Sequence, residues 1–187
     1  MTEPLRDERD PATILDAATV FEGLVWDVDR ETVEFGDGTI TREFVAHTGA
    51  VAVLAIDDQE RVLLINQYRQ PIRSRDWEIP AGLLDVEGES PLLAAQRELA
   101  EEADIVAAEW SEPITFHTSP GGSNEVIHLF EARGLTASPA VHDRTEEEVG
   151  IVLRWVPLAE AIEAVLDGRL HNGILMIALL ASHARRG

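Results

Sequence analysis

The sequence predicts a folded domain of the α/β or α+β class, preceded by a β-rich N-terminal extension. Three observations support this prediction. Residues 49–56 form a continuous apolar run, which is typical of a strand buried on both faces. Residues 90–105 begin with Ser-Pro and continue with good helix formers, as a helix does at its N-terminus. Residues 13–45 are rich in β-branched and aromatic side chains, which favour strands.

The N-terminal part of the chain is predicted to be a tail followed by a small sheet. Residues 1–12 are polar and contain two prolines, so we expect a mobile tail. Residues 13–45 contain three β-rich segments, with a hairpin turn expected at residues 36–38; the segments span residues 19–28, 31–35 and 39–45. A three-stranded ribbon has little core of its own, so it needs a partner surface.

Residues 46–187 are predicted to form the main domain. The buried strand at 49–56 is followed by a turn and a returning strand, and later apolar segments predict more strands and two helices. We expect strands at 62–67, 106–117, 125–132 and 149–156, a loop at 134–144, a helix at 158–166, and a final amphipathic helix from Asn172 or Gly173 to about Arg185.

Composition restricts the class of function. The formal net charge is −20, and no basic stripe stands out, so binding to a nucleic-acid backbone is not expected. The N-terminus lacks a signal-peptide pattern, and the apolar run at 174–181 is too short to cross a bilayer. We therefore expect a cytoplasmic protein with no membrane partner. A small anionic substrate would need metal ions to bridge it to so acidic a protein.

The predicted helix at 90–105 carries three carboxylates on neighbouring positions. Glu98, Glu101 and Glu102 are three and four residues apart, so they share one face. Carboxylates are the ligands that hard divalent cations such as Mg²⁺ prefer. A solvated acidic helix face is the alternative interpretation. The stripe expected to be buried consists of Leu92, Ala95, Leu99 and Ala103.

The segment from residue 82 to 105 resembles the signature of the Nudix hydrolase family, G-x5-E-x7-R-E-U-x-E-E-x-G-U, where U is apolar. The matching residues are Glu89, Arg97, Glu98, Leu99, Glu101, Glu102 and Ile105. The sequence departs from the signature at two points. Six residues separate Gly82 from Glu89, and Asp104 stands at the second glycine position. Neither departure removes a carboxylate.

The resemblance implies a metal site and its supporting residues. Glu98, Glu101 and Glu102, with the backbone carbonyl of Ala81, would bind Mg²⁺, and Mn²⁺ could serve instead. The resemblance also implies that Glu102 is a catalytic residue. The supporting residues would be Gly82, Glu89 and Arg97, of which Glu89 and Arg97 would orient the ligand carboxylates.

Further strings resemble the branch of the family that cleaves ADP-ribose. These are QYR-x-P around Arg69, WEIPAG around Glu78, and Pro120 at a characteristic distance after the signature. The resemblance implies that Arg69, Glu78, Arg73, Pro120 and Glu125 bind substrate. A surface salt bridge is the alternative for the arginines. His128 is expected to be a packed or half-exposed histidine and no metal ligand.

The general base of that branch is a glutamate on a loop outside the signature. Three glutamates precede the predicted strand at 149–156, and counting back from Trp155 selects Glu148, with Glu147 second. A solvated loop end is the alternative for this acidic run, and Glu146 also stays open.

Together, the resemblance implies an α/β Nudix fold, a mixed sheet between helices with an N-terminal antiparallel β-extension. It implies Mg²⁺-dependent hydrolysis of ADP-ribose to AMP and ribose 5-phosphate, in a homodimer formed through the N-terminal sheet. Another nucleoside diphosphate linked to X, such as a nucleotide sugar or a dinucleotide, is the alternative substrate. A non-catalytic nucleotide sensor is the alternative from another class.

Overall fold

The structure is a computed structural model that describes residues 4–139 and 150–186. Two compact units share the chain. The first unit comprises residues 1–47 and 119–124, and the second comprises residues 48–118 and 125–187. The short segment 119–124, which carries Pro120, therefore belongs to the N-terminal unit although it comes from the middle of the sequence.

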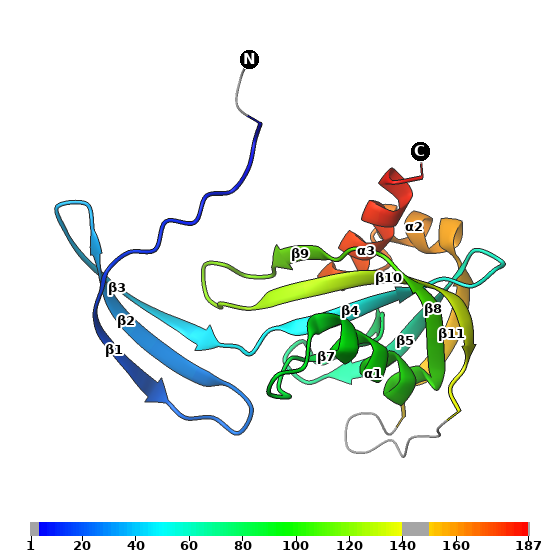
Figure 1. Cartoon of the computed structure of the whole chain (residues 1–187), viewed down its shortest axis with the longest axis horizontal. Coiled ribbons are helices and arrows are strands. Elements are labelled where there is room, and N and C mark those ends of the chain that lie inside the picture. The colour runs from blue at the N-terminus through cyan, green and yellow to red at the C-terminus, as the bar shows by residue number, and fades with distance from the viewer. Residues whose placement is uncertain (1–3, 140–149, 187) are drawn as a thin grey trace. The chain divides into compact units, whose positions relative to one another are not determined.

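The first unit is a three-stranded antiparallel sheet in the order β1-β2-β3 (Figure 1). Its strands are β1 (Ile14–Phe21), β2 (Asp27–Phe35) and β3 (Gly38–Ala46). The hairpin turn predicted at residues 36–38 joins β2 to β3, and Gly36 adopts a φ of 57° there.

The prediction of one strand over residues 19–28 is wrong, because a tight turn interrupts it after Phe21. The Gly23 N–H donates to the Asp27 carboxylate at 3.0 Å. A Cβ on Gly23 would collide with the Trp26 carbonyl, so only glycine fits this turn.

The segment 119–124 is hydrogen-bonded to the end of β3. The Val45 N–H donates to the Gly122 carbonyl at 2.9 Å, and the His47 N–H donates to Oδ1 of Asn124 at 2.8 Å. The rings of Trp26 and His47 stack with centroids 4.1 Å apart. These contacts add hydrogen bonds and ring packing to a three-stranded sheet that has little core of its own.

The second unit contains two sheets and three helices. One sheet has the order β7-β4-β10-β8, with β9 also paired to β10, and the other has the order β11-β5-β6. β4 and β10 pair in parallel, and the other pairs are antiparallel. The strands are β4 (Ala50–Ala55), β5 (Arg61–Arg69), β6 (Ser74–Glu78), β7 (Ala81–Leu83), β8 (Ile105–Trp110), β9 (Ile114–His117), β10 (Val126–Ala137) and β11 (Val152–Pro157), and the helices are α1 (Pro91–Ala103), α2 (Leu158–Leu166) and α3 (Gly173–Ala184).

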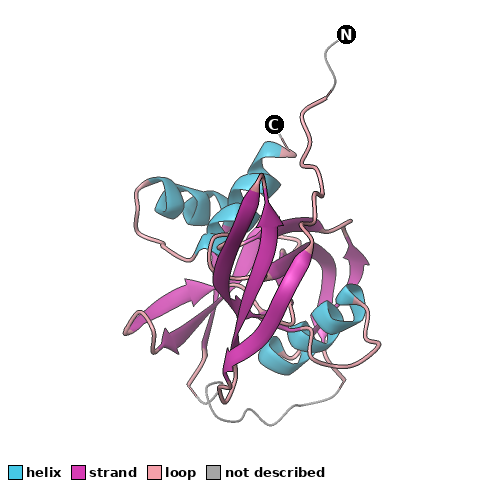
Figure 2. Cartoon of the chain, turned by 90° about the vertical axis from the view of Figure 1, so that its left-hand side faces the viewer, coloured by secondary structure: helices cyan, strands magenta, loops and turns pink. Residues whose placement is uncertain are grey.

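Helices cover both faces of the sheet that contains β4 and β10. Val51 and Val53 pack with Leu99 of α1 on one face, whereas Leu54 packs with Leu175 of α3 on the other. Figures 1 and 2 show α1 on one side of these strands and α2 and α3 on the other. Burial of one such leucine stabilises the fold by about 1.5–3 kcal/mol. The α/β prediction, a mixed sheet between helices, is confirmed.

Two strand predictions in this unit need correction. The predicted strand 106–117 is two strands, β8 and β9, separated by Pro113, and both pair with β10. The loop predicted to begin at Gly134 begins later, because β10 continues to Ala137. Pairing with β8 holds Leu135 and Thr136 in the sheet, although Gly134 has a φ of 64°.

An ion-pair cluster joins the C-terminus of the chain to the sheet. Arg133 donates to both carboxylate oxygens of Glu60, at 2.8 and 3.2 Å, and to Glu131 at 2.9 Å. Arg186, after α3, bonds the same two glutamates, and the buried Ser182 donates to Glu131 at 2.7 Å.

Among the described helices, none is both long and apolar enough to span a membrane.

Candidate active site

Helix α1 begins at the predicted Ser90 and Pro91, and Asp104 caps its C-terminus. Oγ of Ser90 accepts the Leu93 N–H at 3.3 Å, and Pro91 occupies the first turn. Asp104 takes the left-handed conformation with a φ of 54°, and its N–H donates to the Ala100 carbonyl at 3.0 Å. Aspartate at the second signature glycine is therefore compatible with the helix end.

The predicted division of α1 into an apolar buried face and an exposed acidic face is wrong. Glu98 and Glu102 are only 9% and 6% exposed, whereas Leu92 is 37% exposed. Ala95, Leu99 and Ala103 are buried as predicted. Two carboxylates therefore lie at the interface between helix and sheet, where removal from water is costly unless they have polar partners.

Gly82 on β7 provides the space for the first buried carboxylate. A Cβ at this position would collide with the carboxylate atoms of Glu98. The strand and the helix can approach this closely only because residue 82 has no side chain. The packing thus explains why a glycine stands in front of the signature helix.

The second buried carboxylate is held by the neighbouring residue of the same strand. The Ala81 N–H donates to Oε2 of Glu102 at 3.0 Å. β7 thereby holds Glu102 through a backbone hydrogen bond and leaves room for Glu98 beside Gly82. The contact involves the N–H of Ala81; metal ligation by its carbonyl stays a prediction.

Arg97 joins the acidic residues at the solvent side of the site. It donates to both carboxylate oxygens of Glu89, at 3.0 and 3.2 Å, to Glu98 at 2.6 Å and to Glu101 at 3.1 Å. Arginine suits such contacts because its guanidinium presents several donors in a fixed plane. The predicted pairing of Arg97 with Glu101 is present in the structure.

The electrostatics of the site follow from burial and from Arg97. Burial raises the pKa of Glu98, although Arg97 acts in the opposite direction, while the charges of Glu101 and Asp85 raise this pKa further. Hydrogen bonds from Arg97 lower the pKa of Glu89. Asp85 was not selected from the sequence; its only signal there is its place in the acidic loop before Glu89.

The residues present fit a divalent cation by donor type. Glu98, Glu101 and Glu102 are oxygen donors on successive turns of one helix, and Gly82 leaves room beside them. Within residues 4–139 and 150–186, no three acidic or histidine side chains are already gathered as a set of metal ligands. Arg97 and the Ala81 N–H engage the carboxylates in this conformation. Cation binding would replace part of these contacts.

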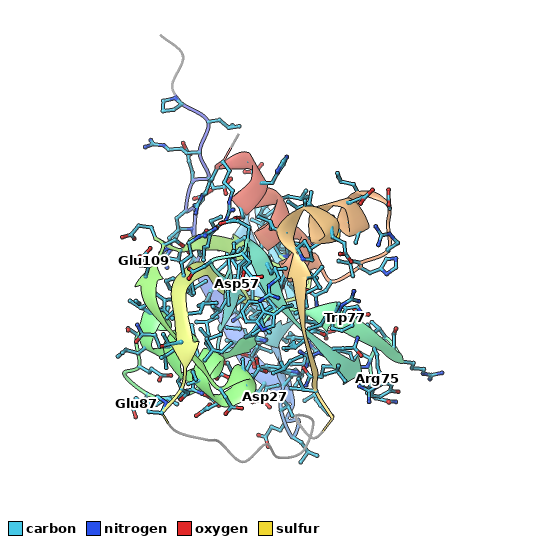
Figure 3. The ribbon with its side chains drawn as sticks, turned by 90° about the vertical axis from the view of Figure 1, so that its right-hand side faces the viewer. Asp27, Asp57, Arg75, Trp77, Glu87 and Glu109 are labelled. Atoms are coloured by element: carbon cyan, nitrogen blue, oxygen red, sulfur yellow. The ribbon has the colours of Figure 1, made fainter. Side chains whose placement is uncertain are left out.

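Two of the predicted substrate-binding residues bond to each other. Arg69 on β5 donates to both carboxylate oxygens of Glu78 on β6, at 2.9 and 2.8 Å. Glu78 is buried, whereas the Arg69 side chain is 40% exposed. Arg73 is exposed in the turn between these strands, with a φ of 51°. Figure 3 labels Arg75 and Trp77 on β6.

The remaining predicted site residues come from three other parts of the chain. Glu125 directly precedes β10 and accepts a hydrogen bond from Thr118. Pro120 belongs to the first unit, and its contact with substrate stays a prediction. Glu146, Glu147 and Glu148 lie outside the described residues, so the identity of the general base also stays a prediction.

Comparison with known proteins identifies a family model and related sequences. A family model described as NUDIX domain matches residues 46–176. The ADP-ribose pyrophosphatase of Mycobacterium tuberculosis is 41% identical over 95% of this chain and 85% of its own length. The ADP-ribose pyrophosphatase of Bacillus subtilis is 38% identical, with 82% of each chain covered.

Other matches broaden the picture of substrate and support the fold. A GDP-mannose pyrophosphatase of Yersinia enterocolitica is 32% identical over 70% of this chain and 71% of its own length. A crystal structure of an ADP compounds hydrolase superposes with a TM-score of 0.78 and covers 96% of both chains at 23% identity. At that identity the structural likeness supports the fold alone.

Proposed function

This chain belongs to the Nudix family of hydrolases, and on that premise we propose that it hydrolyses the diphosphate of ADP-ribose to AMP and ribose 5-phosphate. The observation that carries the proposal is the contact between β7 and α1. Two nearly buried carboxylates, Glu98 and Glu102, are held beside Gly82 and Ala81. Carboxylates that are buried in this way are typical of functional sites.

The proposed metal ligands are Glu98, Glu101, Glu102 and the carbonyl of Ala81. Nudix hydrolases generally use divalent metal ions, and Mg²⁺ suits a site of carboxylates and substrate phosphates, with Mn²⁺ as a substitute. When bound, such an ion neutralises phosphate charge and lowers the pKa of a coordinated water. Arg97 orients Glu98 and Glu101 through its hydrogen bonds, and Glu89 holds Arg97 in place.

The proposed general base is Glu148, with Glu147 as the second choice. Its role would be to accept the proton of the attacking water, a contribution of about 10²- to 10⁴-fold in rate. The remaining proposed substrate contacts are made by Arg69, Arg73, Glu78, Pro120 and Glu125. Arg69 is the strongest of these, since a partly exposed arginine suits a phosphate.

A different nucleoside diphosphate linked to a sugar is the second candidate substrate. The GDP-mannose pyrophosphatase among the relatives motivates it. The chemistry at the diphosphate would be unchanged, and only the residues that bind the two ends of the substrate would differ. A non-catalytic sensor is disfavoured because all the carboxylates of the signature are present.

We also propose a homodimer that uses the N-terminal sheet. All eight residues of β1 are exposed, and large apolar side chains of the first unit face solvent, among them Ile14, Phe21, Val25 and Phe35. Exposed apolar surface of this kind favours association. Light scattering during size exclusion would show a dimer, and Phe21→Lys would shift it to the monomer. A wild-type protein that is monomeric at micromolar concentration would contradict this proposal.

The test of the proposed reaction is AMP release from ADP-ribose with Mg²⁺, with and without EDTA, beside GDP-mannose and other nucleotide sugars. We expect metal-dependent release that is fastest with ADP-ribose. Glu102→Gln should abolish it, while Glu109→Gln, an exposed acid on β8 labelled in Figure 3, should not. Faster turnover of another diphosphate would change the substrate, and binding without turnover of any would favour the sensor.

A further inference from the structure

One row of four residues crosses the sheet beneath α1. Val51 of β4 is the Cα partner of Gly82 on β7 and of His128 on β10, and His128 is the partner of Thr115 on β9. Paired residues on neighbouring strands direct their side chains to the same face. His128 therefore lies on the face of the sheet that also holds the Glu98 carboxylate.

The periodicity of β10 gives the same result independently. Phe130 and Ala132 follow His128 at steps of two and belong to the core beneath α1. Residues at such steps on a strand share a face. His128 is thus the continuation of this apolar row toward the open end of β10.

Along this row of the sheet, burial beneath helix α1 ends between Phe130 and His128. Val51 and Phe130 are 0% and 3% exposed, whereas His128 is half-buried and Thr115 is exposed. Strands in a sheet are about 4.8 Å apart, so His128 lies roughly 10 Å from Gly82 along the row. A diphosphate bound at Glu98 is too short to cover that distance, so one of the two groups attached to it would lie over His128.

The imidazole is oriented by a hydrogen bond. Nδ1 of His128 lies 3.2 Å from Oγ1 of Thr115. When the threonine hydroxyl donates to Nδ1, the neutral ring carries its hydrogen on Nε2. The pair then offers an N–H donor and a hydroxyl, a combination that suits sugar hydroxyls.

We propose that His128 is a specificity residue that hydrogen-bonds, through Nε2, a hydroxyl of the sugar on the non-nucleoside side of the diphosphate, and that Thr115 is its positioning residue. The inference rests on the proposed function, since it assigns one contact within that substrate. It extends the site from α1 across β4 to β10 and β9.

Two substitutions separate this role from a structural one. In His128→Gln the side-chain amide can stand near the position of Nε2, whereas in His128→Asn it stands near that of Nδ1. We expect His128→Asn to lower kcat/KM for ADP-ribose about 3- to 10-fold, mainly through KM, as loss of one neutral hydrogen bond does. His128→Gln should lose clearly less, and Thr115→Val should lie between them.

The matched control is His183→Asn, because His183 is exposed on α3 at the other face of the sheet. It should keep wild-type kinetics. The proposal is overturned if His128→Asn keeps the wild-type KM, or if Asn and Gln lose activity equally in step with a lower Tm. The second outcome would mean that the histidine only packs against Thr115.

A binding measurement makes this test independent of turnover. The ring resonances of His128, assigned by their loss in His128→Asn, should shift when ADP-ribose is added with Ca²⁺ in place of Mg²⁺. They should shift much less with AMP, which lacks the second sugar. Equal shifts with both ligands, or none with either, would refute the contact. Failure of the wild type to hydrolyse any diphosphate would refute the proposed function and leave this readout in force.

Discussion

The carboxylate of Glu98 occupies the space where a side chain on Gly82 would stand. The two residues come from a strand and a helix that the loop at 84–90 joins, and the Glu102 bond to Ala81 fixes the same approach one residue earlier. The position of the carboxylates therefore depends on the missing Cβ of Gly82 on β7 as much as on the helix itself.

Gly82→Ala should displace Glu98 and lower both activity and stability. Overpacking at a closed interface costs about 1–3 kcal/mol, and a displaced ligand should reduce kcat at least about tenfold. Urea unfolding and steady-state kinetics would measure the two effects. Gly173→Ala is the matched control, because nothing lies within 4 Å of a Cβ added there. A Gly82→Ala enzyme with wild-type kcat would show that Glu98 need not stay where it is.

Arg97→Ala should destabilise the protein more than Arg97→Lys. Removal of the guanidinium leaves the nearly buried Glu98 without a charge partner, at a cost of about 1–3 kcal/mol. Lysine keeps the charge but cannot bond both oxygens of Glu89 in the same plane. Thermal unfolding of the two variants, with kcat measured at saturating Mg²⁺, would rank them. Equal stability of both variants and the wild type would refute the structural role of Arg97.

The bond between Arg69 and Glu78 should couple the contributions of these two residues to kcat/KM. Arg69→Lys should raise KM for ADP-ribose about tenfold with a smaller change in kcat, because it removes a planar phosphate contact. Glu78→Gln should weaken the ion pair that orients Arg69. A double-mutant cycle on kcat/KM would detect the coupling as a deviation from additivity. Strictly additive effects would mean that the two residues act separately.

Glu148→Gln should reduce kcat about 10²- to 10⁴-fold while sparing metal affinity, because a general base acts on the water and is no ligand in this proposal. Glu147→Gln should have a much weaker effect. Rates and Mn²⁺ binding would be compared for both variants. If Glu147→Gln is the inactive one, the assignment moves by one residue along the loop.

The ion-pair cluster around Glu60 should make the free energy of unfolding fall at acidic pH. Hydrogen bonds from Arg133, with those from Arg186, lower the pKa of Glu60 from its ordinary value of 4.5 to about 2. A lowered folded-state pKa gives stability that is present above pH 4.5 and is lost as pH falls from about 4.5 to about 2. Half-exposure of Glu60 screens the effect. Urea unfolding at several pH values should show a smaller acid slope in Glu60→Gln, and an unchanged slope would assign the loss to other carboxylates.

Local signals in the sequence predicted much of the fold. Ser90, Pro91 and Asp104 bound the helix α1 as expected, and Asn172 begins α3. The missed features depend on tertiary partners. The turn at Gly23 arises from its bond to Asp27, and the extension of β10 past Gly134 arises from pairing with β8. Periodicity alone carries no information about such partners.

The candidate site shows the same limit. The spacing of the glutamates identified the residue set, but it suggested that Glu98 and Glu102 were exposed. Their burial follows from the closeness of β7, which only the fold reveals. His128 could not be linked to the carboxylates from the sequence, because the link runs through the pairing partners of Val51.

The parallel pairing of β4 with β10 sets the order in which this site can be assembled. Ala50 and Ile127 are partners although the whole signature segment lies between them in the chain. Contacts between residues so far apart in sequence form late and slowly, because the intervening chain must first lose conformational entropy. β7 and α1 are close in sequence and can meet through local contacts, whereas the row that joins Gly82 to His128 requires the pairing of β4 with β10. During synthesis, the proposed metal ligands would therefore come together before the proposed contact to the sugar forms.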